Sequence, residues 1–241
     1  MSTARGARAR AREEVTAAIK DEARRQLAAE GAAKLSLRAV ARELGMVSSA
    51  LYRYFPSRDD LLTALIIDAY DSVGEAAERA DAALLEEAAK SGAGAIAPVR
   101  RWVTVGEAVR AWALAHPHEY ALIFGSPVPG YTAPMTTVPA ASRVGLLFVG
   151  IVRDAYQGRG IAEPPLSEEL RPEAERLGAD LAPDLPPAVV AALVAAWAQL
   201  FGLIGFELFG QFNRVVEDRS TFFTHAATQL AHGVGLVLPR A

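Results

Sequence analysis

Apolar residues recur at helical spacing along almost the whole of this 241-residue chain. Near the N-terminus, Val15, Ile19, Ala23 and Leu27 follow one another every four residues, which places them on one face of an α-helix. No segment shows the two-residue alternation of a half-buried β-strand. Apolar residues make up 51% of the chain, enough to fill a sizeable core. The sequence therefore predicts an all-α protein.

Glycine, proline and serine mark the ends of the predicted helices. Gly45 and Pro56 each end a helix, while Ser36 and Ser57 stand where a side-chain oxygen can cap the next one. We expect helices over residues 8–30, 37–44, 47–55, 57–90, 96–115, 117–124, 140–157, 167–178, 187–213 and 218–236. The segments predicted to lie outside helices include a disordered start (1–7), a hinge (91–95) and a loop rich in proline and glycine (125–139).

The charges are divided unevenly along the chain. Residues 1–58 carry 12 lysines and arginines against 6 acidic residues, whereas the remaining residues have a net charge of −9. A basic N-terminal segment on an acidic body predicts that only this segment binds a polyanion. The chain has no cysteine, which excludes disulfides, thiolate chemistry and zinc fingers. No signal-peptide pattern opens the sequence, so we expect a cytoplasmic protein.

Residues 36–55 have the pattern of a helix-turn-helix within the basic segment. Two short helices are joined by a tight turn at Gly45, and Leu51 and Phe55 have the spacing to face the core. The opposite face of the second helix fits a DNA major groove, where small hydroxyls allow close approach and arginine can read guanine. That face carries Ser48, Ser49, Tyr52 and Arg53, with Tyr54 and Arg58 placed for phosphate at its end. On residue types alone, the same face could simply be solvated.

The stretch "LSLRAVARELGMVSSALYRYFPSRDDLL" (residues 35–62) resembles the TetR family of bacterial transcriptional regulators. The resemblance rests on the positions Ser36, Ala41, Gly45, Leu51–Tyr52, Tyr54–Phe55, Arg58 and Leu61–Leu62. It implies that Ser36, Tyr54 and Arg58 bind phosphate and that Ser48, Ser49, Tyr52 and Arg53 face bases. We expect Arg38 to bind DNA as well. The implied partner is a double-stranded, palindromic operator.

Two features of the basic segment leave alternatives open. The family commonly has Ser or Thr after the Gly-Val of the turn, whereas here Met46 and Val47 precede Ser48. Because valine has no capping oxygen, the recognition helix is expected to start differently. The arginines at 5, 8, 10 and 12 fit either a minor-groove arm or a solubilising tail.

Residues 110–134 and 197–212 resemble one C-terminal domain type of the same family, often named after a Trp-His-Gly motif. This resemblance implies a cavity for a small hydrophobic or aromatic effector, and Arg110, His116, Glu119 and Gln199 could supply its polar contacts. The predicted effector-binding residues are Trp102, Trp112, Phe124, Tyr131 and Phe148. The resemblance also implies a homodimer built from the last two helices, with Trp197, Phe201, Gly202, Gly205, Phe206 and Phe209 at the interface. For any single effector residue, plain core packing is the competing interpretation.

Other classes of protein leave weaker signals. Residues 188–206 form an apolar run long enough for a membrane span, but a buried dimer helix has the same composition, and we expect no membrane. "HPHE" (116–119) is conceivable as a metal site, yet no second cluster accompanies it. No catalytic motif is visible, so we predict no enzyme activity, no cofactor and no metal.

The sequence thus predicts a two-domain, ligand-responsive DNA-binding regulator, and the family resemblance implies that it is a repressor. Residues 8–56 are expected to form a three-helix helix-turn-helix domain that binds DNA. Residues 57–241 are expected to form a larger helical domain that binds ligand and dimerises. The alternatives are a membrane-associated helical protein and a small-molecule enzyme without a visible motif.

Overall fold

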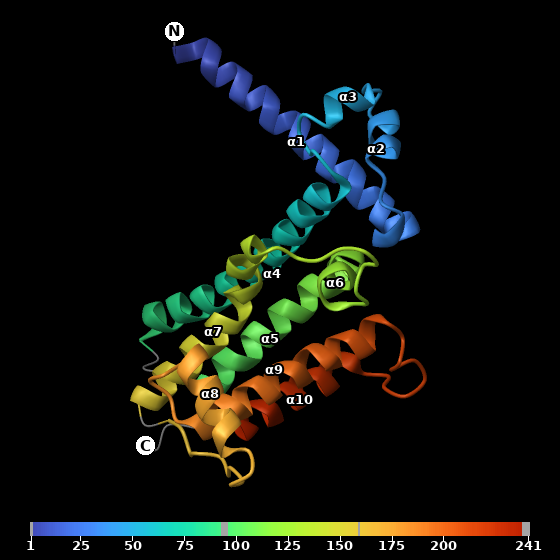
Figure 1. Cartoon of the computed structure of the whole chain (residues 1–241). Coiled ribbons are helices and arrows are strands. Elements are labelled where there is room, and N and C mark those ends of the chain that lie inside the picture. The colour runs from blue at the N-terminus through green and yellow to red at the C-terminus, as the bar shows by residue number, and fades with distance from the viewer. Residues whose placement is uncertain (1, 93–95, 159, 238–241) are drawn as a thin grey trace. The chain divides into compact units, whose positions relative to one another are not determined.

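The computed structural model describes residues 2–92, 96–158 and 160–237, and this part of the chain is helical without any strand. Its one extended pairing is an isolated antiparallel bridge between Ile161 and Leu236. The all-α prediction is confirmed (Figure 1). The α-helices are α1 (Ser2–Glu30), α2 (Leu37–Glu43), α3 (Ser48–Leu51), α4 (Arg58–Ser91), α5 (Pro98–Ala115), α6 (Pro117–Phe124), α7 (Val138–Gln157), α8 (Arg171–Leu181), α9 (Pro187–Leu208) and α10 (Arg219–Gly233). Two 3₁₀ helices, η1 (Ala32–Lys34) and η2 (Met135–Thr137), complete the set.

The chain folds into two compact units. The head unit comprises Met1–Tyr70 and His116–Ala140, and the body unit comprises Asp71–Ala115 and Ala141–Ala241. Helix α4 begins in the first and ends in the second, because the division falls after Tyr70. Helix α6 and the loop after it cluster with the head unit. The predicted domain boundary at residues 56 and 57 divides the chain by function and stays a prediction.

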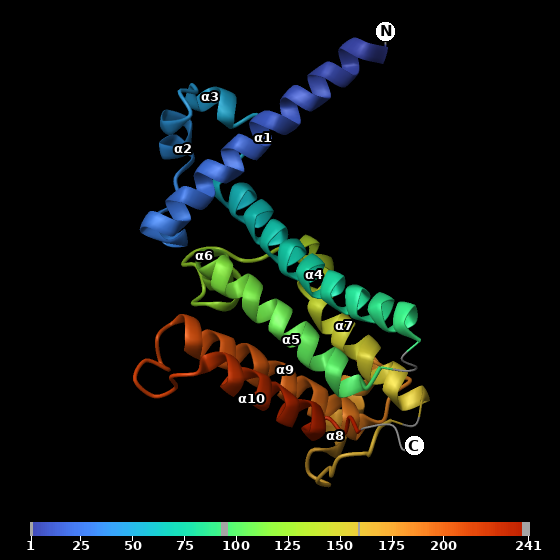
Figure 2. The same cartoon turned by 180° about the vertical axis from the view of Figure 1, so that it is seen from behind.

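The head unit packs α1, α2, α3 and the first turns of α4 around one apolar core. Ile19 and Ala23 from α1, Val40 from α2 and Leu51 from α3 are each fully buried there, as are Leu61 and Leu62 from α4. The predicted N-caps are confirmed. The Ser36 hydroxyl accepts from the Ala39 amide at 3.4 Å, and the Ser57 hydroxyl accepts from the Asp60 amide at 3.1 Å. The N-terminal half of α1 runs beyond α2 and α3 in both views (Figures 1 and 2).

The body unit is built around α5, α9 and α10, which lie side by side in both views (Figures 1 and 2). Gly106 allows the close approach of α5 to α9, since a Cβ built there would lie 3.4 Å from a methyl group of Leu200. The guanidinium of Arg110 on α5 donates to both carboxylate oxygens of Glu207 on α9, each at 2.7 Å. This pair is largely buried and fixes the register of the two helices.

The structure corrects several predicted helix boundaries, those of α1, α3 and α9 among them. Helix α1 begins at Ser2, so residues 2–7 continue the helix where disorder was predicted. Helix α3 ends at Leu51, after which Tyr54 bonds to the carbonyl three residues back as the chain tightens before Pro56. Helix α9 ends at Leu208 because Gly210 adopts a left-handed conformation (φ 85°), where the prediction ran to 213. Residues 93–95 of the predicted hinge lie outside the described residues.

Within the part of the chain that the structure describes, two helices are long and apolar enough to cross a membrane by length and composition. They are the segment Met135–Gln157, which contains α7, and α9, and in each the most apolar window is 39% buried. The buried core helix of a globular protein passes the same test, so this finding is weak evidence for a membrane span. Both helices pack against other helices of the body unit, as the cavity described below illustrates.

Candidate DNA-binding surface, ligand cavity and dimer face

Helix α3 presents a polar face to solvent and an apolar face to the core of the head unit. Leu51 is fully buried and Phe55 is 7% exposed, whereas Tyr52 is 42% exposed. Ser48, Ser49 and Arg53 are exposed as well. The four side chains predicted to face bases are therefore all accessible, Ser48 and Ser49 on α3 and Tyr52 and Arg53 in the cap and turn that follow it. That arrangement leaves two hydroxyls, a phenol and a guanidinium available to donate to or accept from base edges.

The start of α3 has no side-chain cap. Val47 occupies the N-cap position in an extended conformation, makes no side-chain capping hydrogen bond, and is 70% exposed. Helix α3 therefore begins at Ser48 without a side-chain cap. Gly45 in the preceding turn adopts φ 63°, a left-handed conformation that favours glycine and lets the chain reverse between α2 and α3.

The residues predicted to bind phosphate lie in different surroundings. Ser36 caps α2, and Arg38 is exposed on the same helix. The ring of Tyr54 lies beneath the guanidinium of Arg12 from α1, 5.1 Å from the ring centroid. Arg12 also donates to the Arg53 carbonyl at 3.3 Å. Arg12, one of the arginines at positions 5, 8, 10 and 12, thus packs against the residues that follow α3.

Arg58 is engaged inside the head unit. Its guanidinium donates to the carbonyl oxygens of Ala32 at 2.8 Å, Leu35 at 3.1 Å and Ala33 at 3.3 Å. These carbonyls belong to the η1 turn and the residue after it, where the backbone has spare acceptors. The structure therefore gives Arg58 a stabilising role that the sequence did not predict, and its phosphate contact stays a prediction.

A cluster of charges joins three helices of the head unit. Arg24 on α1 donates to Asp21 at 2.8 Å, to Asp68 on α4 at 2.7 Å and to Glu119 on α6 at 3.0 Å. Lys20 donates to the other oxygen of Asp68 at 2.8 Å. Glu119 is therefore an ion-pair partner in the head unit, and its contact with an effector stays a prediction. Among the described residues, no group of three histidine or acidic side chains is placed to hold a metal ion.

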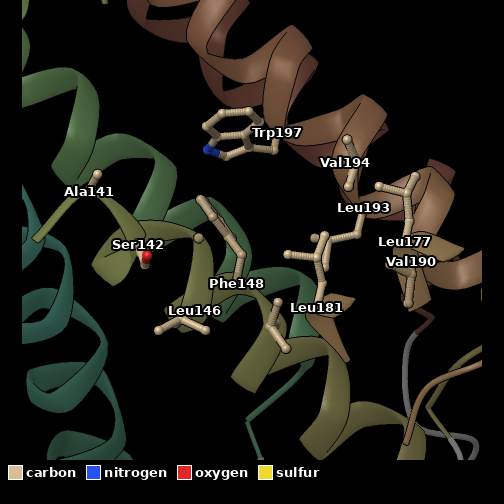
Figure 3. A pocket seen from close by; sticks show the side chains of 12 residues that line it. Ala141, Ser142, Leu146, Phe148, Leu177, Leu181, Val190, Leu193, Val194 and Trp197 are labelled. Carbon is tan, nitrogen blue, oxygen red and sulfur yellow. The ribbon is translucent and has the colours of Figure 1, made fainter. Parts of the chain in front are cut away.

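The body unit contains an apolar cavity of about 310 Å³ between α7, α8 and α9. In Figure 3, Phe148 from α7 and Trp197 from α9 both point into the space between these helices. Small residues open it on the α7 side, since a Cβ built on Gly145 would meet no atom within 4 Å. The lining residues are Ala141, Ser142, Gly145, Leu146, Phe148, Val149, Leu177, Leu181, Val190, Leu193, Val194 and Trp197. This size and lining are those of a site for a small apolar molecule.

Of the five residues predicted to bind the effector, Phe148 lines this cavity. Trp102 stacks on Phe148 with ring centroids 4.3 Å apart, and Trp112 donates from Nε1 to the Ser72 hydroxyl at 2.8 Å. Phe124 and Tyr131 belong to the head unit. Phe124 packs edge-on against Tyr70, and the Tyr131 hydroxyl lies 2.8 Å from that of Thr63. These four residues have packing roles in the structure, and their contact with an effector stays a prediction.

The residues that the sequence missed at the cavity share a helical signal. Ser142, Gly145 and Val149 repeat at three and four residues on α7, and Leu177 and Leu181 are four apart on α8. Each of these two sets of residues also fits plain core packing, so their sequence spacing could not predict a cavity between the helices. Of the polar residues offered for the cavity, Arg110 is held by Glu207, and the Gln199 amide donates to the Ala195 carbonyl.

The predicted dimer residues separate into two groups on α9. Gly202, Phe206 and Phe209 lie on the exposed side, where Phe206 is 54% and Phe209 49% exposed, and Gly205 is half-buried next to them. A Cβ built on Gly202 would meet no atom within 4 Å, so another helix can approach closely there. Trp197 and Phe201 stack on each other 5.5 Å apart, with Trp197 at the cavity and Phe201 buried.

Comparison with known proteins assigns both parts of the chain. Residues 19–65 match the family described as bacterial regulatory proteins, tetR family, and residues 102–230 match the tetracyclin repressor-like C-terminal domain. HTH-type transcriptional regulators of Mycobacterium tuberculosis (Rv1816) and Mycobacterium bovis (Mb1846) are each 41% identical to this chain over 218 residues, which cover 86% of this chain and 86% of each relative. The chain belongs to the TetR family. It is a DNA-binding transcriptional regulator, as the helix-turn-helix prediction indicated.

Solved structures of TetR-like proteins share the fold. The regulatory protein SCO4313 is 32% identical, with a TM-score of 0.73 over 92% of this chain and 98% of its own. RolR, crystallised with its ligand resorcinol, is 15% identical, with a TM-score of 0.52 over 96% of this chain and 98% of its own. The second likeness concerns the fold alone. Together they confirm a helix-turn-helix head and a larger C-terminal helical domain as the architecture of this TetR-family chain.

Proposed function

We propose that this protein is a homodimeric repressor that binds a palindromic operator and releases it when a small hydrophobic or aromatic effector enters the body unit. The observation that carries the DNA-binding part is the exposed polar face of α3 and the turn after it, formed by Ser48, Ser49, Tyr52 and Arg53 within the basic N-terminal segment. The buried Leu51 fixes which side of the helix turns outward. Such a face can enter a major groove, while basic side chains around it contact phosphates.

The proposed dimer rests on the exposed side of α9 and the adjoining helix α10. Phe206 and Phe209 on α9 and Phe222 on α10 are each more than 40% exposed, and Gly202 leaves room for a second helix. Large aromatic side chains in a row on a helix surface mark an interaction site. A symmetric dimer presents two recognition helices, and it therefore matches an operator with two half-sites roughly 34–36 Å apart.

The proposed effector site is the cavity between α7, α8 and α9. Its volume of about 310 Å³ and its apolar lining support a small hydrophobic or aromatic effector. Resorcinol, the ligand in the RolR structure, is a small aromatic molecule of this kind. Release then follows from a population shift: an effector that favours a body conformation with a different spacing of the two recognition helices lowers the affinity for DNA. Helix α4 belongs to both units and is the continuous element that can carry this change.

We infer that the protein acts in the cytoplasm without a membrane span or an enzymatic reaction of its own. Two results would favour the other classes. Partition into detergent through residues 188–206 would indicate a membrane-associated protein, and turnover of a small molecule without DNA binding would indicate an enzyme.

The salt dependence of DNA binding tests the proposed function. If the protein contacts about 6–10 phosphates, affinity should fall about 10³–10⁵-fold between 50 and 200 mM salt. Fluorescence anisotropy with a labelled duplex from the region upstream of the gene measures this at both salt concentrations. An affinity that does not change with salt would contradict binding through the basic segment.

A further inference from the structure

The cavity between α7, α8 and α9 has no charged side chain in its lining. Among the described residues that form it, the Ser142 hydroxyl and the Trp197 indole N–H are the polar side-chain groups. All others are aliphatic, aromatic or glycine; Phe148, Val190 and Leu193 among them are buried, whereas Leu146, Leu181 and Trp197 are partly exposed. A ligand in this space therefore meets hydrocarbon over most of the surface that the protein covers.

The arginines closest in sequence to the lining residues are already neutralised. On α7, Arg143 directly follows Ser142, but its guanidinium is bound to Asp71 at 2.8 Å and to Glu78 at 2.6 Å, both on α4. The hydrogen bonds that Arg143 donates to Glu78 and then to Asp71 raise the pKa of Arg143 above its ordinary value, and the bond that Glu78 accepts lowers the pKa of Glu78. The guanidinium is thus held by two carboxylates of the protein itself.

The same holds for the other arginines of α7 and α8. Arg153 on α7 pairs with Asp184, Arg171 on α8 pairs with Glu168, and Arg176 on α8 pairs with Glu173 and Asp180. Helix α9 carries no lysine or arginine, and its one acidic residue, Glu207, is bound by Arg110. An anionic ligand in the cavity would have to break one of these pairs to find a counter-ion. A cationic ligand would find no carboxylate in the lining.

We propose that this cavity admits only uncharged ligands: aromatic or aliphatic molecules whose polar groups are limited to hydroxyl or carbonyl functions. This inference rests on the proposed function, since it names the chemical class of the effector. Its physical basis is that an ionised carboxylate or ammonium group buried without a partner is strongly unfavourable, so such a group neutralises or stays out. A carboxylic acid would bind only through its small protonated fraction, which falls tenfold for each pH unit above its pKa.

Two probes with the same ring system test the charge requirement. Isothermal titration calorimetry of the full-length protein with 2-naphthol and with 2-naphthoic acid is carried out from pH 6 to pH 8, without DNA. We expect the Kd of 2-naphthol to stay constant over this range. We expect 2-naphthoic acid to weaken about tenfold per pH unit, because a carboxyl group with a pKa near ~4.3 is increasingly ionised. An acid that binds at pH 8 as tightly as at pH 6, or no binding of 2-naphthol at millimolar concentration, would overturn the proposal.

Substitutions at two glycines on α7 test whether 2-naphthol binds in this cavity. Gly145 lines the cavity and Gly150 does not, and a Cβ built on either would meet no atom within 4 Å. Both Gly145→Leu and Gly150→Leu replace a poor helix former with a good one, so both variants should fold. We expect Gly145→Leu to abolish 2-naphthol binding by filling the cavity and Gly150→Leu to retain it. Retained binding in Gly145→Leu would place the site elsewhere and overturn the assignment.

The failure of this inference can be told apart from the failure of the proposed function. If 2-naphthol binds as expected but does not displace the protein from its operator, the charge preference stands and the proposed effector response fails. If 2-naphthoic acid at pH 8 binds the cavity and releases the operator, the proposed function stands and the charge preference fails.

Discussion

Replacing Arg58 by alanine tests whether this side chain stabilises the head unit, contacts DNA, or does both. Its guanidinium donates to the Ala32 and Leu35 carbonyls at 2.8 and 3.1 Å, with a third, longer bond to Ala33 at 3.3 Å. Hydrogen bonds from a charged donor are each worth about 1.5–3 kcal/mol when lost, and the side chain is 29% exposed, which favours the lower end. Counting the two shorter bonds at the lower end, Arg58→Ala should lower the free energy of unfolding by about 3 kcal/mol.

The assay combines stability with binding. For a chain of this length, a loss of this size corresponds to a fall in Tm of roughly 6–12 °C, measured by circular dichroism. Arg42→Ala serves as the control, because Arg42 forms only an exposed pair with Glu43 at 3.4 Å, which should contribute less than about 1 kcal/mol. DNA affinity is then compared well below both melting temperatures. An unchanged Tm for Arg58→Ala would refute the structural role, whatever happens to DNA binding.

If Arg58 also contacts phosphate, the folded Arg58→Ala variant should bind all DNA sequences more weakly by a similar factor. If its role is confined to the η1 turn, the folded variant should bind DNA like the wild type. A loss limited to one operator base would contradict both readings.

Three further predictions follow from other contacts. Ser49→Ala on α3 and Tyr52→Ala at its C-cap change exposed side chains and should alter preference among operator base variants by about 1–3 kcal/mol with Tm unchanged. An unaltered preference in anisotropy titrations would reject the base-facing assignment. In urea unfolding, Trp112→Phe should lower the free energy of unfolding by about 1 kcal/mol more than Trp102→Phe. The reason is that Trp112 loses its hydrogen bond to Ser72, whereas the buried Trp102 Nε1 has no partner among the described residues. Equal losses in the two variants would argue against a contribution from the Trp112–Ser72 bond. Glu207→Leu should lower the free energy of unfolding by about 3 kcal/mol, because Arg110 stays buried without its partner. Adding Arg110→Met should recover part of that loss. Additive losses in the double variant would show that the two side chains are not coupled.

The helix-turn-helix could be predicted from sequence because its signals are local. Ser36, Gly45 and Pro56 act within a few residues of their own position, through a cap, a left-handed turn and a missing amide. The departure at Val47 was equally visible, since a side chain without oxygen cannot cap a helix wherever the chain folds. Helix ends such as Leu208 were less accurate, because the apolar period continues into residues that the fold uses in a turn.

The long-range contacts could not be predicted in the same way. Arg24 meets Asp68 and Glu119 across 44 and 95 residues, and nothing in the local sequence selects these acids over their neighbours. Arg58 matched a DNA-binding pattern, yet the nearby carbonyls of the η1 turn accept its hydrogen bonds. Trp197 was assigned to the dimer because it lies on an apolar helix, and only the packing of α7 and α8 places it at the cavity.

Footprinting on the DNA upstream of the protein's own gene tests the central claim most directly. A dimer with two α3 helices should protect a palindrome whose half-sites are centred about 10–10.5 base pairs, or a multiple of this, apart. Ser49→Ala should shift which bases are protected within each half-site. Protection of a single, unpaired half-site, or salt-sensitive coverage with no preferred sequence on any tested fragment, would contradict a dimeric operator-binding regulator.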